Sequence, residues 1–266
     1  MADGTGHARD LLAGSVLVSG PGFRGALGEG AGDSLEPVWA PDSQSIVFTA
    51  TTNALVAAYA ESVSHLYQVS LAGGEPRALT SGDASHSNAT FSPDGRRLGF
   101  LVNSGERRIY SLDRLAVAHW PWTGSIKTLA RTLDRSVGGY SFSTDNETIY
   151  FSAEDSGRIQ IWSVPIDGGE PRLAIERSQG VWLSMTIPPR AAIPVLFGHW
   201  ETATQPAEVF RVDLTSGTSR RLTEFNVAAA AGLDWQPLRE LWGALGQLVA
   251  GDHDPVPMPY WPCRTR

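Results

Sequence analysis

The segment Gly73–Arg77, with the sequence Gly-Gly-Glu-Pro-Arg, recurs letter for letter at Gly168–Arg172. The offset between the two copies is 95 residues, which corresponds to two periods of roughly 48. An internal period of this size is typical of chains that stack small supersecondary units, because each unit buries its apolar faces only against its neighbours. The repeat therefore limits the possible folds more strongly than any single motif does.

Each repeat opens with an aromatic residue, a turn that carries aspartate, and an apolar strand. Three turns, Trp39–Asp42, Phe91–Gly95 and Phe142–Asp145, place their aspartates 52 and 51 residues apart. Proline, where present, fixes φ at the first corner, and the aspartate caps its own backbone two residues further on. Strands on both sides of such a turn form a hairpin. A fourth, less regular copy runs from Leu183 to Phe197.

Each repeat also closes in the same way, with a strand, a glycine turn and a second, short strand. The turn glycines are 50, 45 and 48 residues apart: Gly74, Gly124, Gly169 and Gly217. Two hairpins per period give four strands, which is one blade of a β-propeller. A β-sandwich with accidental internal similarity is the alternative, but it needs no common period. We therefore predict an all-β fold, a β-propeller with about four full blades and a partial blade in an incomplete ring.

The repeats divide the chain into regions. Residues 38–235 hold the four blades, and residues 1–18 are expected to be the closing strands of a truncated blade, because Asp3–Leu11 parallels Asp167–Leu173. Residues 19–37 form a Gly-rich loop. The chain pattern therefore predicts one long repeat region that follows an incomplete unit.

Two further segments depart from the repeat. Ala54–Val63 is expected to be a short helix or a long hairpin tip. Residues 236–266 form an atypical tail, in which Leu238–Val249 has helical spacing and four prolines then follow within eight positions. We interpret this tail as the product of a shifted reading frame or of a truncated gene.

Composition excludes several classes of function. The net charge of −7 argues against nucleic acid or an anionic membrane as a partner. Cys263 is the single cysteine, so an internal disulfide and a cysteine-based zinc site are both excluded. No apolar run approaches 18 residues, and the N-terminus lacks the features of a signal peptide. The chain as written is expected in the cytoplasm, or in the periplasm if its start is truncated.

The stretch from about Ser34 to Trp235 resembles the propeller of the prolyl oligopeptidase family, in particular bacterial dipeptidyl and acylaminoacyl peptidases. The residues that carry this resemblance are the aromatic-x-Pro-Asp turns, the Gly-Gly-Glu-Pro-Arg segments and Arg221–Asn226. The resemblance implies that Arg221–Asn226 closes the last blade shortly before an α/β-hydrolase domain with a Ser-His-Asp triad. It also implies that the propeller admits short peptides to that triad and excludes folded proteins.

The chemistry of that family requires a Gly-x-Ser-x-Gly nucleophile elbow, and this sequence contains none. Gly139–Ser143 comes closest, but its last residue is serine and it lies on an expected strand. No catalytic residue can therefore be assigned, and the chain alone is expected to be inactive. The leading prediction is a non-catalytic, substrate-gating propeller fragment of a serine peptidase. A standalone Tol-type propeller that binds proteins is the alternative, and a five-bladed sugar-active enzyme would need converging carboxylates, of which we find no aligned set.

One residue is a candidate for substrate binding. In some relatives a propeller carboxylate binds the free α-amine of the peptide through charge-assisted hydrogen bonds, and Glu201 is the residue of that type here. It belongs to His199–Glu201, which we expect in a loop just beyond the strand Val195–Phe197. The alternative is that Trp200 packs at a blade edge and Glu201 is solvated.

The remaining aromatic and imidazole side chains have structural interpretations. The six histidines are scattered without metal-ligand spacing, so neither a metal nor a cofactor is expected. His65 and His119 are expected to pack or to form hydrogen bonds at strands. Trp39, Phe91 and Phe142 recur once per repeat and could form an aromatic binding surface, but we expect them to fill the core between neighbouring blades.

Overall fold

The computed structural model describes residues 9–19, 35–52, 63–104, 111–175 and 179–236. These residues form sixteen β-strands and one four-residue helix, α1 (Val227–Ala230), so the fold is all-β. The features expected at Ala54–Val63 and Leu238–Val249 lie almost wholly or wholly outside the described residues. No helix in the described ranges combines the length and apolarity needed to cross a membrane.

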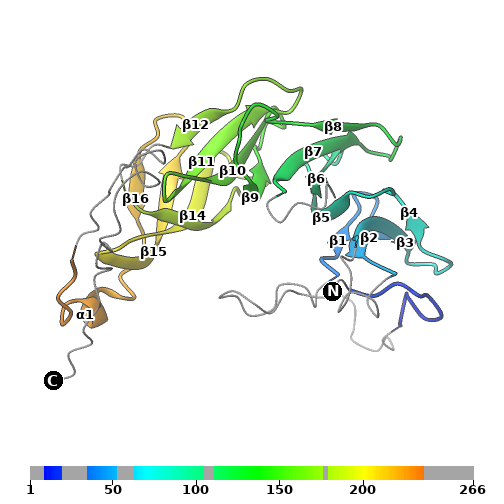
Figure 1. Cartoon of the computed structure of the whole chain (residues 1–266), viewed down its shortest axis with the longest axis horizontal. Helices are drawn as coiled ribbons and strands as arrows, with labels where there is room; N and C mark the ends of the chain where they lie inside the picture. Colours follow the sequence, from blue (N-terminus) through cyan, green and yellow to red (C-terminus); the bar gives the residue numbers. More distant parts are fainter. Residues whose placement is uncertain (1–8, 20–34, 53–62, 105–110, 176–178, 237–266) are drawn as a thin grey trace, which may run out of the picture.

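The strands pair into successive antiparallel units of four, which follow one another along an arc (Figure 1). The first sheet contains β1 (Val38–Trp39), β2 (Ser45–Ala50), β3 (His65–Ser70) and β4 (Arg77–Ala78). The second sheet contains β5 (Ser85–Phe91), β6 (Arg97–Asn103), β7 (Asp113–His119) and β8 (Ile126–Thr128).

The third sheet has eight strands and comprises two further units. One unit is β9 (Val137–Phe142), β10 (Thr148–Asp155), β11 (Arg158–Pro165) and β12 (Arg172–Ile175). The other is β13 (Val181–Thr186), β14 (Val195–Thr202), β15 (Gln205–Asp213) and β16 (Ser219–Arg221). Within each unit the pairing is antiparallel, and a single parallel pair, Ile159 with Val181, joins the two. The expected hairpin repeats are therefore present.

The aspartate turns form as their sequence predicts. The carboxylate of Asp42 accepts the amide of Gln44 at 2.8 Å, and that of Asp94 accepts the amide of Arg96 at 3.0 Å. Gly95 sits at φ +70°, and a Cβ there would collide with the ring of Pro41 in the preceding turn. Turns of neighbouring units are thus in direct contact, which requires glycine at this corner.

Each unit packs its faces against its neighbours, and we call each such contact a joint. Val47 and Leu66 of the first unit meet Leu98 and Phe100 of the second. The second joint buries residues of both sheets, Leu101, Leu115, Val117, Leu129, Phe142, Ile149 and Phe151, and the third joint joins Ile161 and Ile175 to Trp182, Leu196 and Phe210. The hydrophobic core is therefore divided into wedges between sheets.

The three repeated aromatic residues have different environments. Phe142 is 4% exposed within the second joint, and Phe91 is half-buried and packs edge-on against Trp120 with ring centroids 5.0 Å apart. The prediction of a shared core position is wrong for Trp39, whose side chain is 60% exposed. Trp39 lies on the face of the first sheet that points away from the second, so the second unit cannot cover it.

That outer face of the first sheet is covered instead by the segment Arg9–Val18, which we call the strap. Leu11, Leu12 and Leu17 of the strap pack against the cluster of Phe48, Ala50 and Val69. Val18 forms an isolated antiparallel bridge with Thr51. Part of the region expected to hold closing strands, residues 1–8, lies outside the described residues, as do residues 20–34 of the expected Gly-rich loop.

Candidate functional site

Glu201 lies in strand β14, where it pairs with Val181 of β13. The expectation of a loop at His199–Glu201 is therefore wrong, because β14 continues to Thr202. Gly180, at φ +93°, precedes β13, and a Cβ there would collide with the carbonyl of Glu201 and the indole of Trp200. Glu201 is half-buried, and the structure brings no second carboxylate to it among the described contacts.

His199 forms a hydrogen bond with Ser184 on the neighbouring strand. The distance between Ser184 Oγ and His199 Nδ1 is 3.0 Å, and both side chains are exposed. A catalytic triad needs a third, acidic group that orients the histidine, and a donor pair that stabilises the oxyanion. None of the described contacts of His199 involves a carboxylate, and Ser184 lies within an extended strand rather than at a strand-to-helix turn. The pair therefore does not form an assembled triad.

Trp200 belongs to the core of the third joint. Its ring meets that of Phe210 edge-on with centroids 5.4 Å apart, next to Trp182 and Leu196. The interpretation of Trp200 as a packing residue is confirmed. Because successive side chains in a strand point to opposite faces, His199 and Glu201 face away from this core.

A buried carboxylate fixes the chain where it leaves the last unit. Glu208 is 3% exposed and accepts hydrogen bonds from the backbone amides of Phe225 at 3.1 Å and Asn226 at 2.7 Å, and from the hydroxyl of Thr223. Asn226 in turn donates its side-chain amide to the carbonyl of Ala207 at 2.7 Å. These bonds, first of all that from Thr223, hold the pKa of Glu208 below its usual value.

Sequence reasoning identified Arg221–Asn226 as a closing segment but missed Glu208, its partner. The signal lies in the alternation of β15, where Glu208 shares the inward face with Phe210 and Val212. A carboxylate at an inward position requires buried donors. We call the contact of Glu208 with Thr223, Phe225 and Asn226 the clamp. A cavity of about 460 Å³ lies beside the clamp and is lined by Gln205, Arg221 and Trp235 among others.

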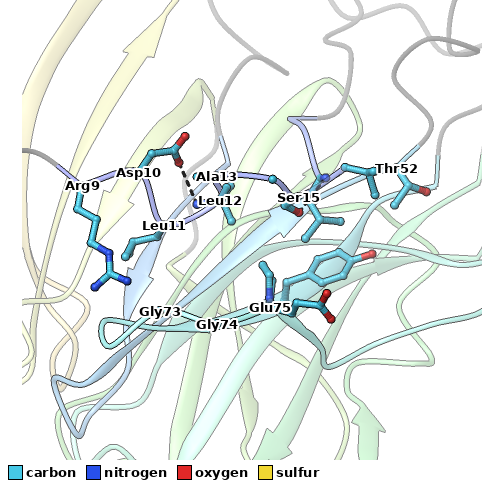
Figure 2. Close-up of a pocket in the computed structure, with 15 residues that line it drawn as sticks. Arg9, Asp10, Leu11, Leu12, Ala13, Ser15, Thr52, Gly73, Gly74 and Glu75 are labelled. Atoms are coloured by element: carbon cyan, nitrogen blue, oxygen red, sulfur yellow. Dashed lines mark hydrogen bonds between the residues drawn. The ribbon is translucent and has the colours of Figure 1, made fainter.

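A larger cavity, of about 770 Å³, lies between the strap and the outer face of the first sheet (Figure 2). Arg9 of the strap donates to the carbonyls of Leu71 at 3.3 Å and Ala72 at 3.2 Å. Asp10 accepts the amide of Leu12 at 2.9 Å and so fixes the turn of the strap (Figure 2). The charged groups here hold the strap in place and do not converge on one point.

The described residues contain no group of three or more His, Cys, Asp or Glu side chains that could hold a metal ion. His65 and His86 do meet across the first joint, with ring centroids 5.7 Å apart. His119 contacts Arg97, whose guanidinium also forms an ion pair with Asp167 at 3.3 Å. His65 and His119 thus lie in packing and hydrogen-bonding positions at strands, as expected from the sequence.

Comparison with known proteins agrees with this architecture. No family model matches the chain. Dipeptidyl-peptidase 5 of Porphyromonas gingivalis is 25% identical over 191 residues, which cover 71% of this chain and 27% of that protein. Dipeptidyl-peptidase 5 of Trichophyton schoenleinii is 32% identical over 95 residues, or 35% of this chain and 13% of that protein. The chain therefore spans about a quarter or less of the length of these curated relatives.

Solved structures give the same picture of the fold. Acylaminoacyl peptidase of Pyrococcus horikoshii matches with a TM-score of 0.54 and 22% identity over 74% of this chain and 28% of that one. The β-propeller domain of the trilobed protease of Pyrococcus furiosus matches with a TM-score of 0.52 and 17% identity, over 71% of this chain and 54% of that one. TolB of Acinetobacter baumannii matches with a TM-score of 0.52 and 16% identity, over 70% and 42%.

The chain thus has an all-β fold of antiparallel sheets similar to β-propeller domains. It matches part of dipeptidyl-peptidase 5 and of acylaminoacyl peptidase, which are peptidases of the prolyl oligopeptidase family. The family resemblance predicted from the sequence is confirmed.

Proposed function

We propose that this chain is the substrate-gating propeller part of a serine peptidase of the prolyl oligopeptidase family and has no peptidase activity by itself. The observation that carries the proposal is the coverage of its relatives, since the match extends over 71% of this chain but only 27% of dipeptidyl-peptidase 5. A match of that extent leaves most of the relative, and room for its catalytic machinery, outside this chain.

The described residues support the inactive part of the proposal. The Ser184–His199 pair has the first two groups of a triad, but the described contacts supply no acid, and the full sequence has no Gly-x-Ser-x-Gly elbow. In the complete peptidase the partners of this part would be an α/β-hydrolase domain and a short peptide substrate. Glu201 is our candidate for the substrate's α-amine, because its side chain faces away from the packed core of the last unit.

Hydrolysis of aminoacyl and dipeptidyl p-nitroanilides tests the inactivity. The purified chain is expected to release p-nitroaniline no faster than buffer does. A matched Ser184→Ala variant separates a real activity from contamination, because it removes the hydroxyl that is hydrogen-bonded to the ring of His199. A rate in the wild-type chain that disappears in Ser184→Ala would show that the chain is an enzyme and would overturn the proposal.

The second candidate is a standalone Tol-type propeller that binds other proteins. The similarity of fold to TolB, with a TM-score of 0.52 over 70% of this chain, favours it. The two candidates differ in what the encoding gene should contain, because only the first requires coding sequence for a hydrolase domain.

A further inference from the structure

The joints between units repeat one arrangement of side chains. After the third strand of each unit, an apolar residue pairs with that strand and points into the next joint. The backbone amides of Leu79, Leu129 and Leu222 each donate to a third-strand carbonyl at 2.8 Å, and Ile175 pairs with Ile161 of β11. Where a unit follows, this residue is buried: the exposed fractions are 8% for Leu79, 2% for Leu129 and 4% for Ile175.

In the last unit, the residue at the equivalent position is Leu222, and no neighbouring sheet in the described part of the chain packs against it. Leu222 is 47% exposed. Phe197 and Val209 lie on the same face by strand alternation, because Leu196 and Phe210 point into the third joint. We call the surface of Phe197, Val209 and Leu222 the exit face. These three residues are the apolar part of a face that also carries His199 and Glu201, and this face corresponds to the first half of a joint.

The first unit provides a face that corresponds to the second half of a joint. The outer face of this sheet, with Trp39, Phe48, Tyr67 and Val69, is the entry face. Trp39 stands 52 residues before Phe91, at the same place in the repeat, and Phe91 packs into the first joint. On the entry face the strap covers Phe48 and Val69 but leaves Trp39 60% exposed.

Beside the strap, the entry face also has open space. The cavity of about 770 Å³ beside the strap, with Tyr67 in its lining, lies on a face that, in the other units, is filled by a neighbouring sheet. The exposed Trp39 on the same sheet is the kind of anchor that interfaces use, because a large rigid ring buries much apolar area at low entropic cost.

We propose that a second copy of this chain docks its exit face on the entry face, with Trp39 as the anchor and the cavity beside the strap as the space that the partner fills. We infer a second copy as the partner because each joint within the chain already packs a face equivalent to the exit face against one equivalent to the entry face. The contact is heterologous, so it either closes into a ring or continues into a chain. Two copies provide eight units, which lies within the range of closed propellers.

Sedimentation velocity over a range of protein concentrations tests the proposal with the full 266-residue chain. The wild-type chain is expected to associate reversibly. Trp39→Glu and Leu222→Glu each place a charge in the contact and are expected to raise the Kd about tenfold or more. Ile193→Glu is the matched control, because Ile193 is 50% exposed but lies in the bend before β14, outside the strands that form the two faces. Circular dichroism confirms that each variant is folded.

A mixing experiment identifies the direction of the contact. The Trp39→Glu variant keeps an intact exit face, and the Leu222→Glu variant keeps an intact entry face. Neither variant should associate alone, whereas an equimolar mixture should form a heterodimer through one wild-type joint. This recovery is specific to a head-to-tail contact, since an interface between two identical patches would not be restored by mixing.

Three results would overturn the proposal. A wild-type chain that stays monomeric at every concentration would show that the two faces do not bind each other. Association that Ile193→Glu weakens as much as the other two substitutions do would place the contact elsewhere. Failure of the mixture to associate would rule out the head-to-tail geometry.

Discussion

Single residues in this chain acquire their environment from the neighbouring sheet rather than from their place in the repeat. Trp39 and Phe142 occupy equivalent turns, yet their exposed fractions are 60% and 4%. The same contrast separates Leu222 from Leu129. A sequence repeat identifies which residues are able to fill a joint, but the presence of the opposing sheet decides whether they do.

Burial in the first joint affects the protonation of His86. It is 5% exposed, its ring lies 5.8 Å from that of Phe100, and the Nδ1 atoms of both His86 and His65 are buried without a hydrogen-bond partner among the described atoms. Burial, followed by the nearby His65, lowers the pKa of His86 from 6.5 to about 4. The folded chain therefore favours neutral His86.

The first joint should consequently lose stability in acid. Between pH 6.5 and about 4, His86 is protonated in the unfolded chain but neutral in the folded chain. The free energy of unfolding therefore falls as the pH drops through this range. With allowance for screening by water near the pair, we expect a loss of about 1–2 kcal/mol. Urea denaturation at pH 7.5 and pH 5 measures it. His86→Phe should flatten this pH dependence, and the exposed His199→Gln should not; equal slopes in all three proteins would contradict the assignment.

At the scale of elements, the sequence predicted the hairpins and their order because the aspartate turns and glycine turns are local signals. It could not place the clamp between β15 and the closing segment, because Glu208 and Asn226 are 18 residues apart and belong to no common motif. It also assigned His199–Glu201 to a loop, since the apolar pattern of β14 weakens before the strand ends. The candidate Glu201 was therefore chosen by residue type, and its strand position came only from the structure.

The clamp predicts how the closing segment responds to mutation. Glu208→Gln replaces one acceptor oxygen by a donor group, so at least one of the three hydrogen bonds to Glu208 must be lost. Amide hydrogen exchange at Phe225 and Asn226 is expected to accelerate by about tenfold, with β14 unchanged. Because the pKa of Glu208 is lowered, the wild-type protection should persist in mild acid and disappear only as the pH falls through that lowered pKa.

Glu224→Gln is the control for this experiment. Glu224 accepts from the guanidinium of Arg221 at 2.7 Å on the surface, where an ion pair contributes little. Its replacement should leave the exchange of Phe225 and Asn226 within about twofold of the wild type. Similar acceleration in both variants would show that Glu208 has no special part in holding the segment.

At the scale of the whole molecule, the chain consists of four-stranded units that stabilise one another through successive joints, and the two ends of the array have faces of the kind that internal joints bury. This organisation resembles β-propeller domains of peptidases, and the chain corresponds to about a quarter of dipeptidyl-peptidase 5. The sequence alone was enough to predict the family resemblance, because the repeat and the closing segment are both present. It allowed no catalytic residue to be assigned, because it contains no nucleophile elbow.

The nucleotide sequence on both sides of the encoding DNA tests the central claim most directly. If this chain is the gating part of a serine peptidase, the downstream sequence should encode, in some frame, a Gly-x-Ser-x-Gly elbow followed by an aspartate and a histidine in the order of an α/β-hydrolase. An unrelated, intact gene directly downstream, with no hydrolase-coding sequence in any frame, would contradict the claim.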